Sequence, residues 1–392
     1  MNILFLAPHP FYQERGTPIA VNLLLQALSR QGHTVDVLTY HEGSDVTHPG
    51  ITLHRIRRPL FARNVPPGPS LKKILCDLVM LPTALKMART KRYDLVHAVE
   101  ESVYMAMLIQ RRYGIPYLYD MDSSLARQIA EKFGFLKFLL PLMARTEGAA
   151  IKRALGVVPV CDALADIARA EGARHITLLR DISLLQPASE ADRTTVQQLI
   201  PDHHRPRLMY LGNLETYQGA DLLLESFACF IQDGGQADLI IAGGKTADVT
   251  RYQEKAATLG IQACTQFLGH QPVSRMAALF EAADILVSPR IKGNNTPMKI
   301  YSYLASGKAI LATALPTHTQ VLTPDVALLA PATVEAFAAA MTTLANNTAL
   351  REQLGQSAST LARQSYSQTS FLKTAQGLYD WVNTELTGHA KV

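Results

Sequence analysis

Two consecutive series of apolar strands alternating with helical segments limit what this chain can fold into more than any other feature. The first series opens at residues 1–7 with MNILFLA, an apolar run typical of a strand buried in a parallel sheet. A polar loop and a helical segment ending near Gly32 follow, and VDVLTY is the next strand. This order forms a right-handed βαβ unit. Further strands are expected at 94–98, 117–120 and 156–160.

The second series begins after a polar, proline-marked segment at residues 184–206. Its expected strands lie at 208–211, 237–242, 266–268, 285–288 and 309–312. The sequence therefore predicts the α/β class, with two Rossmann-like doubly wound domains that face a central cleft. We expect the first domain at 1–190 and the second at 206–365. For the last helical segment, 366–392, packing back on the first domain is one option.

Composition limits the class of protein and its compartment. A length of 392 residues is too long for one ordinary core, and 48% hydrophobic with 18% charged residues excludes a disordered or collagen-like chain. The four cysteines are scattered without a Cys-x-x-Cys pair, which argues against zinc and favours a reducing compartment. No apolar run approaches the roughly 20 residues that span a bilayer, and the N-terminal run lacks a basic leader. We therefore expect a cytoplasmic protein without a metal site.

Basic residues crowd into one stretch of the expected first domain. The net charge of the chain is +5, and residues 55–92 hold ten Lys and Arg with a single acid, Asp77. They flank an apolar block at 74–85, as in helices that lie on an anionic membrane surface. This interpretation predicts peripheral association with the inner face of the plasma membrane, and a solvated helix face is the alternative. Nucleic acid is not an expected partner, because the chain has no reader motif.

Three loops that join a strand to a helix are candidate anion sites, because a helix N-terminus offers free N–H groups and partial positive charge. The first, at 14–18, contains Arg15 and Gly16, although a plain turn explains it equally well. The second, at 212–219, has two glycines but fits neither the P-loop nor the dinucleotide fingerprint.

The third loop, at 288–299, is polar, basic and glycine-marked. Its cations are Arg290, Lys292 and Lys299. Thr296 suits the N-cap of the following helix and Pro297 its first position. A surface loop with chance lysines is the alternative. Because ligands of doubly wound domains bind beyond the carboxyl ends of the strands, we favour a phosphate site.

Motifs along nearly the whole chain resemble the GT-B glycosyltransferases, specifically the large retaining family 4 that uses nucleotide sugars. In chain order they are MNILFLAPHP with a Gly16-Thr17 loop, DLVHA, YLGNLETYQGADLLLESF, LIIAGG, FLGH, ADILVSPR and GNNTPMKIYSYLASGKAILAT. The resemblance implies a nucleotide diphosphate site in the second domain and an acceptor site in the first. It also implies a metal-independent, retaining reaction by front-face attack, in which positive side chains and backbone N–H groups stabilise the leaving diphosphate.

The resemblance implies further partners and residue roles. The nucleotide sugar is a co-substrate with no other cofactor, and the acceptor is a glycan or a lipid-linked glycan. Expected donor-binding residues are Gly16, Thr17, Gly212, Asn213, Gln218, Gly269, His270, Arg290, Gly293, Asn294, Asn295, Thr296 and Ser302. Expected acceptor-binding residues are His9, His97 and Asp122, and expected catalytic residues are Asp120, Lys292, Lys299 and Glu101. Capping or structural roles remain alternatives for the histidines and carboxylates.

Several positions depart from the family pattern. Asn213 and Gln218 stand where the family has an Arg and a Lys, and Ser302 stands where it has the second of two glutamates. Asp120 replaces a family His, and its pair with Asp122 resembles the metal-binding Asp-x-Asp of a different glycosyltransferase fold. Three interpretations follow: an active subgroup whose 288–299 loop supplies the replacement charge, a non-catalytic binding or regulatory subunit of another glycosyltransferase, and a GT-B epimerase acting on nucleotide sugars.

Overall fold

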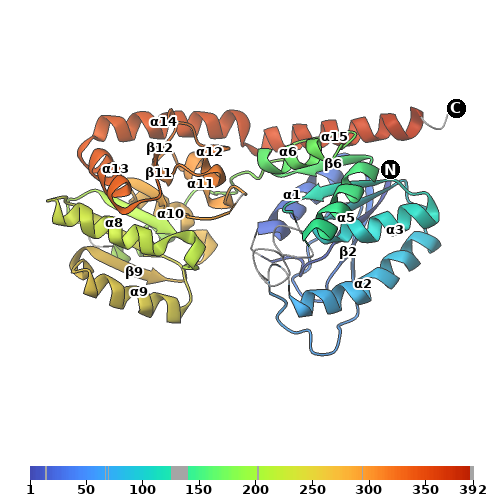
Figure 1. Cartoon of the computed structure of the whole chain (residues 1–392), viewed down its shortest axis with the longest axis horizontal. Helices are drawn as coiled ribbons and strands as arrows, with labels where there is room; N and C mark the ends of the chain where they lie inside the picture. The colour runs from blue at the N-terminus through green and yellow to red at the C-terminus, as the bar shows by residue number, and fades with distance from the viewer. Residues whose placement is uncertain are drawn as a thin grey trace. The chain divides into compact units, whose positions relative to one another are not determined.

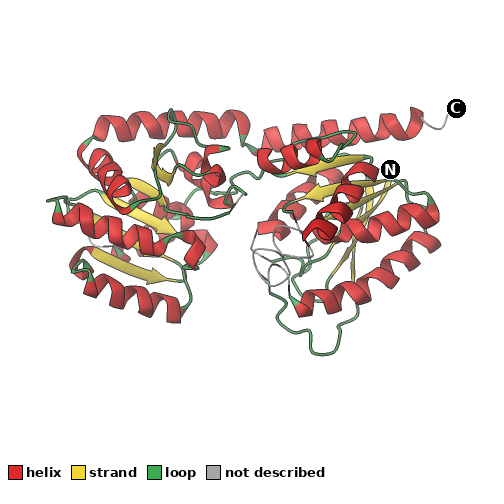
Figure 2. Cartoon of the chain, viewed as in Figure 1, coloured by secondary structure: helices red, strands yellow, loops and turns green. Residues whose placement is uncertain are grey.

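The computed structural model describes residues 1–13, 16–66, 68, 70–124, 140–200, 203–293 and 295–388. The chain forms two compact units, one of Met1–Asp181 with Thr369–Val392 and one of Ile182–Gln368 (Figure 1). Each unit is a parallel sheet covered by helices (Figure 2). The predicted α/β class with two Rossmann-like domains is confirmed.

The first unit is built on parallel strands in the order β3-β2-β1-β4-β5-β6. The strands are β1 (Asn2–Ala7), β2 (Thr34–Thr39), β3 (Ile51–Arg55), β4 (Leu95–Val99), β5 (Tyr117–Met121) and β6 (Gly156–Pro159). The helices are α1 (Gly16–Arg30), α2 (Leu71–Thr90), α3 (Val103–Tyr113), α5 (Leu140–Arg153), α6 (Asp162–Ala170) and α15 (Gln368–Gly388). The strand order reverses between β1 and β4, which makes the carboxyl ends of these two strands the switch point of the sheet.

The second unit repeats this topology, with parallel strands in the order β12-β11-β10-β7-β8-β9. The strands are β7 (Arg207–Leu211), β8 (Asp238–Ala242), β9 (Thr265–Gly269), β10 (Ile285–Ser288), β11 (Ala309–Thr313) and β12 (Leu328–Ala330). The helices are α7 (Glu190–Leu199), α8 (Ala220–Gln232), α9 (Thr246–Thr258), α10 (Met276–Ala282), α11 (Met298–Ser306), α12 (Pro316–Thr319), α13 (Val334–Asn346) and α14 (Thr348–Ser365). Its switch point lies between β7 and β10.

Burial explains which strands the sequence revealed. The β1 side chains from Ile3 to Ala7 are fully buried, because helices cover both faces of the sheet at its centre. The edge strand β3 alternates apolar and polar residues (ITLHR), and the edge strand β12 is only three residues long. These two strands were not predicted.

The segment before β7 belongs to the second unit, which begins at Ile182 rather than after residue 190. Val196 and Ile200 are buried in the same core as Met209 of β7. Arg193 of α7 also forms an ion pair with Glu281 of α10, with Nε 2.7 Å from Oε2. A polar, proline-marked composition thus hid a short amphipathic helix.

From Thr369 onward, α15 belongs to the first unit. Its buried Phe371, Leu378 and Val382 follow the spacing of one helix face. The indole of Trp381 stacks on the His175 ring, with centroids 3.6 Å apart. The C-terminal helix is therefore a packed part of this unit.

We expect Leu378→Ala to lower the free energy of unfolding by about 2–5 kcal/mol, because it leaves a cavity under α15. Chemical denaturation followed by circular dichroism measures the change. Asn383→Ala alters an exposed position of the same helix and should stay within about 0.5 kcal/mol of the unsubstituted protein. Equal stability of the two variants would show that α15 contributes little to this unit.

Candidate functional site

A pocket of about 410 Å³ opens at the carboxyl ends of β7 and β8 in the second unit. It is lined by Leu211, Gly212, Asn213, Ala242, Gly243, Gly244, Lys245, His270, Gln271, Met276 and Lys299. The expected donor-binding residues Gly212, Asn213 and His270 are among them. Sequence reasoning missed Lys245 and the pair Gly243-Gly244, although two glycines directly after an apolar strand were a usable signal.

The two glycine loops approach each other so closely that side chains are excluded. A Cβ on Gly243 would lie 2.1 Å from the carbonyl oxygen of Gly212, and Gly243 has a left-handed φ of +115°. The backbone N–H of Gly243 donates to the Gly269 carbonyl at 2.7 Å. Gly269, expected to bind the donor, is therefore a backbone anchor of the pocket.

Lys299 of α11 brings a positive charge to this pocket. Its Nζ lies 4.1 Å from the centroid of the Tyr210 ring and is buried without a hydrogen-bond acceptor among the described residues. Burial, assisted by the charge of Arg290, lowers the pKa of Lys299 to about 7. A buried ammonium without an acceptor is costly unless an anion binds there.

The other two cations of the 288–299 loop are placed differently. Arg290 Nε donates to the Lys292 carbonyl at 2.7 Å, and its guanidinium lies 5.2 Å from the centroid of the Tyr217 ring. Its guanidinium also leaves room only for a glycine at Gly293, where a Cβ would meet Nη2 at 2.4 Å. The Lys292 side chain is exposed. Arg290 thus shapes the loop, and Lys299 is the cation of this loop that lines the pocket, together with Lys245 of the second glycine loop.

Two further buried polar atoms near these loops have no partner among the described residues, the Gln218 Oε1 and the Thr296 Oγ1. Thr296 was expected to cap the next helix, but α11 starts at Met298 with Pro297 as its cap residue and no side-chain cap bond. The backbone at Pro297 is extended, which moves the helix start one residue later than predicted. Buried polar atoms without a partner in the protein are often satisfied by a bound ligand or water.

The remaining expected residues of this unit lie in the 288–299 loop or in α11, which follows it. The Asn295 carbonyl accepts a hydrogen bond from Thr317 at 2.7 Å, and Ser302 Oγ lies 3.5 Å from Ser183 Oγ. Asn294 lies outside the described residues. His318 Nε2 lies 2.8 Å from Ser288 Oγ at the start of the loop. Burial lowers the pKa of His318 to about 3, so this imidazole stays neutral.

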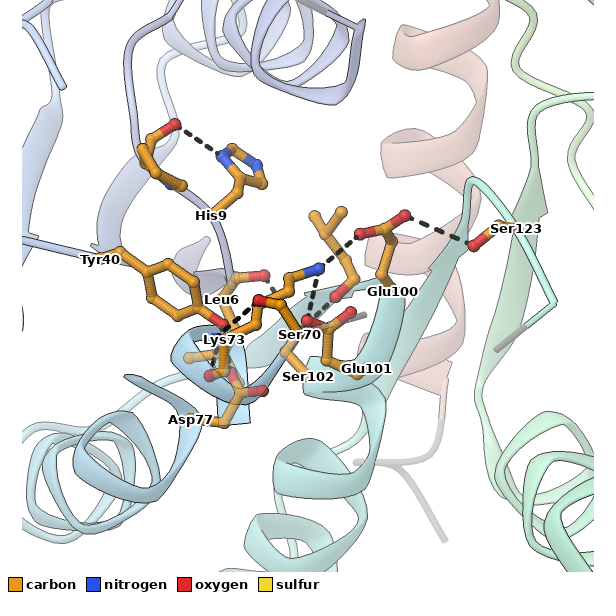
Figure 3. Close-up of polar contacts among 12 residues, drawn as sticks. Leu6, His9, Tyr40, Ser70, Lys73, Asp77, Glu100, Glu101, Ser102 and Ser123 are labelled. Atoms are coloured by element: carbon orange, nitrogen blue, oxygen red, sulfur yellow. Dashed lines mark hydrogen bonds and ion pairs between the residues drawn. The ribbon is translucent and has the colours of Figure 1, made fainter. Parts of the chain in front are cut away.

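In the first unit, carboxylates gather at the switch point around one lysine (Figure 3). The Nζ of Lys73 in α2 lies 2.6 Å from Glu101 Oε1 and 3.3 Å from Glu100 Oε2. The Tyr40 hydroxyl donates a hydrogen bond to Asp77 Oδ1 at 2.6 Å. The sequence had counted Lys73 in a basic surface stretch, whereas the structure buries it facing inward. One ammonium cannot balance three carboxylates, so one of them keeps its proton more easily.

The two neighbouring glutamates respond in opposite directions. Burial raises the pKa of Glu101 to about 8, against the attraction of Lys73. Burial opposes ionisation of Glu100 too, but Lys73 and His9 outweigh it and lower the pKa of Glu100. Glu100 also has a left-handed φ of +48°, a strained conformation for a residue with a side chain. The ionised form is therefore favoured at Glu100, which was not among the expected site residues, and the protonated form at Glu101.

The expected residues of the neighbouring strands join this group. Asp120 is the last residue but one of β5, and its Oδ2 lies 3.1 Å from His97 Nε2. Burial and the charges of Asp120, Glu100 and Asp181 raise the pKa of Asp122, and the Thr17 side chain hydrogen-bonds to Asp122. Gly16, which opens α1 beside Thr17, is in the same unit. Thr17, expected to bind the donor, thus contacts the expected acceptor residue Asp122 within the first unit.

Comparison with known proteins shows that each unit matches the model of a known domain family. Residues 15–180 match the model of the glycosyl transferase 4-like domain, and residues 192–360 match that of glycosyl transferases group 1. A stretch of 116 residues is 28% identical to D-inositol 3-phosphate glycosyltransferase of Corynebacterium glutamicum, covering 28% of this chain and 28% of that relative's length.

Two solved structures share the fold at low identity. Sucrose-phosphate synthase from Thermosynechococcus elongatus aligns with a TM-score of 0.79 at 16% identity, over 98% of this chain and 99% of that one. Anabaena HepE in complex with UDP aligns with a TM-score of 0.76 at 16% identity, over 97% and 100%. The likeness extends through both units.

Because the pKa of Glu101 is raised, its native carboxyl holds a proton that the unfolded chain loses above its ordinary pKa near 4.5. Stability should therefore fall as pH rises from about 5 to about 8, by up to a few kcal/mol. Glu101→Gln should remove this dependence, because an amide mimics the protonated acid. Urea denaturation at several pH values tests it, with exposed Asp166→Asn as the control. Parallel profiles for Glu101→Gln and the unsubstituted protein would contradict the assignment.

Proposed function

This chain belongs to the GT-B glycosyltransferases of the family 4-like kind, and we propose that it transfers a sugar from a nucleotide-sugar donor to a glycan or lipid-linked glycan. The proposed reaction retains the anomeric configuration and needs no metal ion. The donor diphosphate would bind at the second unit's pocket and the acceptor at the first unit's switch point. The observation that carries the proposal is the buried Lys299 ammonium in the pocket.

Lys299 supplies what a departing diphosphate needs. The bond between the anomeric carbon and the diphosphate oxygen breaks, and negative charge grows on that oxygen. An ammonium group fixed in a low-dielectric site stabilises such charge without reorganising. The acceptor hydroxyl forms the new bond on the same face, and its proton passes to the leaving diphosphate.

The departures from the family pattern fit this arrangement. Asn213 and Gln218 can give only neutral hydrogen bonds, which are weaker toward phosphate than charged ones. The Gln218 side chain is buried, and its Oε1 has no hydrogen-bond partner among the residues that the structure describes. We propose that Lys299 replaces the missing charge and that Gln218 and Thr296 orient the donor.

Uridine diphosphate is the first probe, because HepE, which shares this fold, was solved with UDP and with UDP-glucose. A thermal-shift panel of UDP-, GDP-, ADP- and dTDP-sugars would identify the base through ligand-linked stabilisation.

We expect UDP binding at pH 8 to take up close to one proton. Lys299 is largely neutral there in the free protein, and contact with phosphate restores its charge. UDP affinity should therefore fall as pH rises above about 7, and the uptake should vanish near pH 6. Calorimetry in buffers of different ionisation enthalpy measures both quantities.

The matched variants of this experiment are Lys299→Met and Lys308→Met. Burial also lowers the pKa of Lys308. This residue directly precedes β11, at the amino ends of the strands, whereas the pocket lies at the carboxyl ends. Lys299→Met should weaken UDP binding by about 1.5–3 kcal/mol and abolish proton uptake, whereas Lys308→Met should change neither. Unchanged affinity in Lys299→Met would refute the diphosphate role.

A binding or regulatory subunit is the second candidate function. The replacement of charged family positions by Asn213, Gln218 and Ser302 favours it. Such a subunit would bind UDP without releasing UDP from any donor in the panel, while a transferase would release it in the presence of its acceptor.

We also propose that the first unit docks on an anionic membrane. An apolar patch is exposed on the first unit, and it consists of Leu60 and Phe61, which precede α2, and of Leu71, Ile74, Leu75 and Leu78 of α2. Exposed Arg57, Arg58 and Arg63 adjoin it in the sequence, and Lys72 Nζ ties the preceding segment to α2 through the Arg63 carbonyl at 2.6 Å. Apolar side chains rimmed by arginines suit the headgroup region of anionic lipid. No helix in the described ranges is long and apolar enough to cross a bilayer.

Flotation with phosphatidylglycerol-containing vesicles tests this docking. Phe61→Ser with Leu71→Ser should lower the bound fraction at least tenfold, because each buried side chain contributes about 1.5–3 kcal/mol. Added salt should weaken binding, and pure phosphatidylcholine should bind less. Val273→Ser removes an exposed apolar side chain of the second unit and serves as the control. Absence of binding at low salt would refute the proposal.

A further inference from the structure

A chain of hydrogen bonds links the C-terminal helix to Asp120. The Tyr379 hydroxyl of α15 lies 2.8 Å from His97 Nδ1, and His97 Nε2 lies 3.1 Å from Asp120 Oδ2. The three residues come from α15, β4 and β5. They are far apart in the sequence, so only the packing of α15 onto this sheet joins them.

Burial fixes the geometry of the two inner members. His97 is 0% exposed and Tyr379 is 1% exposed. The imidazole stacks on the Phe5 ring, with centroids 4.5 Å apart and planes 10° from parallel. The Asp120 side chain is the outer member, at 14% exposure. The imidazole therefore cannot turn away from either partner without disturbing the core.

The chemistry of the groups sets the direction of the chain. Burial and the charge of Asp120 raise the pKa of Tyr379 well above its usual value, so the phenol keeps its proton. If the phenol donates to Nδ1, that nitrogen must be the acceptor of a neutral imidazole, and the ring proton then resides on Nε2. Nε2–H donates to Asp120 Oδ2, which leaves Oδ1 for other partners.

We propose that Tyr379 is a positioning residue that acts through His97 to hold Asp120 in one orientation for the sugar transfer. The inference rests on the proposed function and on the catalytic role expected for Asp120 from the sequence. The C-terminal helix α15 then has a role in the reaction in addition to packing on the first unit. It sets the tautomer of a buried imidazole and, through it, the presentation of a carboxylate.

A purely structural role for the same contact would be to fasten α15. A matched variant separates the two roles. Tyr117 is equally buried in the same unit and donates to the Ala150 carbonyl at 2.6 Å, without contact to His97. Tyr379→Phe and Tyr117→Phe therefore each remove one buried hydroxyl, but only the first breaks the link to Asp120.

The first measurement uses the free protein and needs no substrate. Long-range proton–nitrogen correlation spectra of the full chain, assigned with His97→Gln, report which ring nitrogen carries the proton. We expect His97 to be neutral with the proton on Nε2, and Tyr379→Phe to shift its Nδ1 resonance or mix the tautomers. Tyr117→Phe should leave the His97 signals unchanged. A doubly protonated ring, a proton on Nδ1, or identical spectra for Tyr379→Phe would overturn the relay.

The second measurement is UDP release from the donor that the binding panel identifies. Tyr379→Phe should lower kcat roughly three- to tenfold with the donor KM unchanged, because one hydrogen bond in the relay is lost. His97→Gln with Tyr379→Phe should be no slower than His97→Gln alone, since the path is already broken. An equal loss in Tyr117→Phe, or a KM change alone, would overturn the positioning role. If no donor is turned over, the proposed function fails, while the spectra still decide the relay.

Discussion

The burial of a single ammonium group is the constraint on which the second unit's site depends. Lys299 lies against the Tyr210 ring without a hydrogen-bond acceptor in the part of the chain that the structure describes. Folding alone gains little from such a cation, because desolvation is not repaid by a partner charge. Its position beside two close-packed glycine loops makes sense when an anion completes the site.

The two units present opposite charges at equivalent places in the same topology. In the first, Glu100, Glu101 and Asp77 share the charge of Lys73 at the switch point (Figure 3). In the second, Lys245 and Lys299 line the pocket. The same strand order thus carries carboxylates at the switch point of one unit and lysines at the pocket of the other.

Strand periodicity revealed the central strands, because a strand buried on both faces must be apolar throughout. Strand β3 was missed because its apolar and polar residues alternate, and β12 because it is only three residues long. Among the site residues, Lys299 was identified from its loop, but its isolation from acceptors was not. Arg290 looked equivalent in sequence, although its guanidinium bonds to the carbonyl of Lys292 in its own loop.

By itself, the sequence determined the α/β class, the two repeated series of strands and helices, and the loops where chemistry gathers. It could do so because apolar periodicity and glycine placement are local properties. Tertiary structure alone decided that Lys73 faces inward, that the pKa of Glu100 is lowered while that of Glu101 is raised, and that Tyr379 reaches Asp120 through His97. Protonation and hydrogen-bond direction depend on neighbours brought together across hundreds of residues, and no local pattern encodes them.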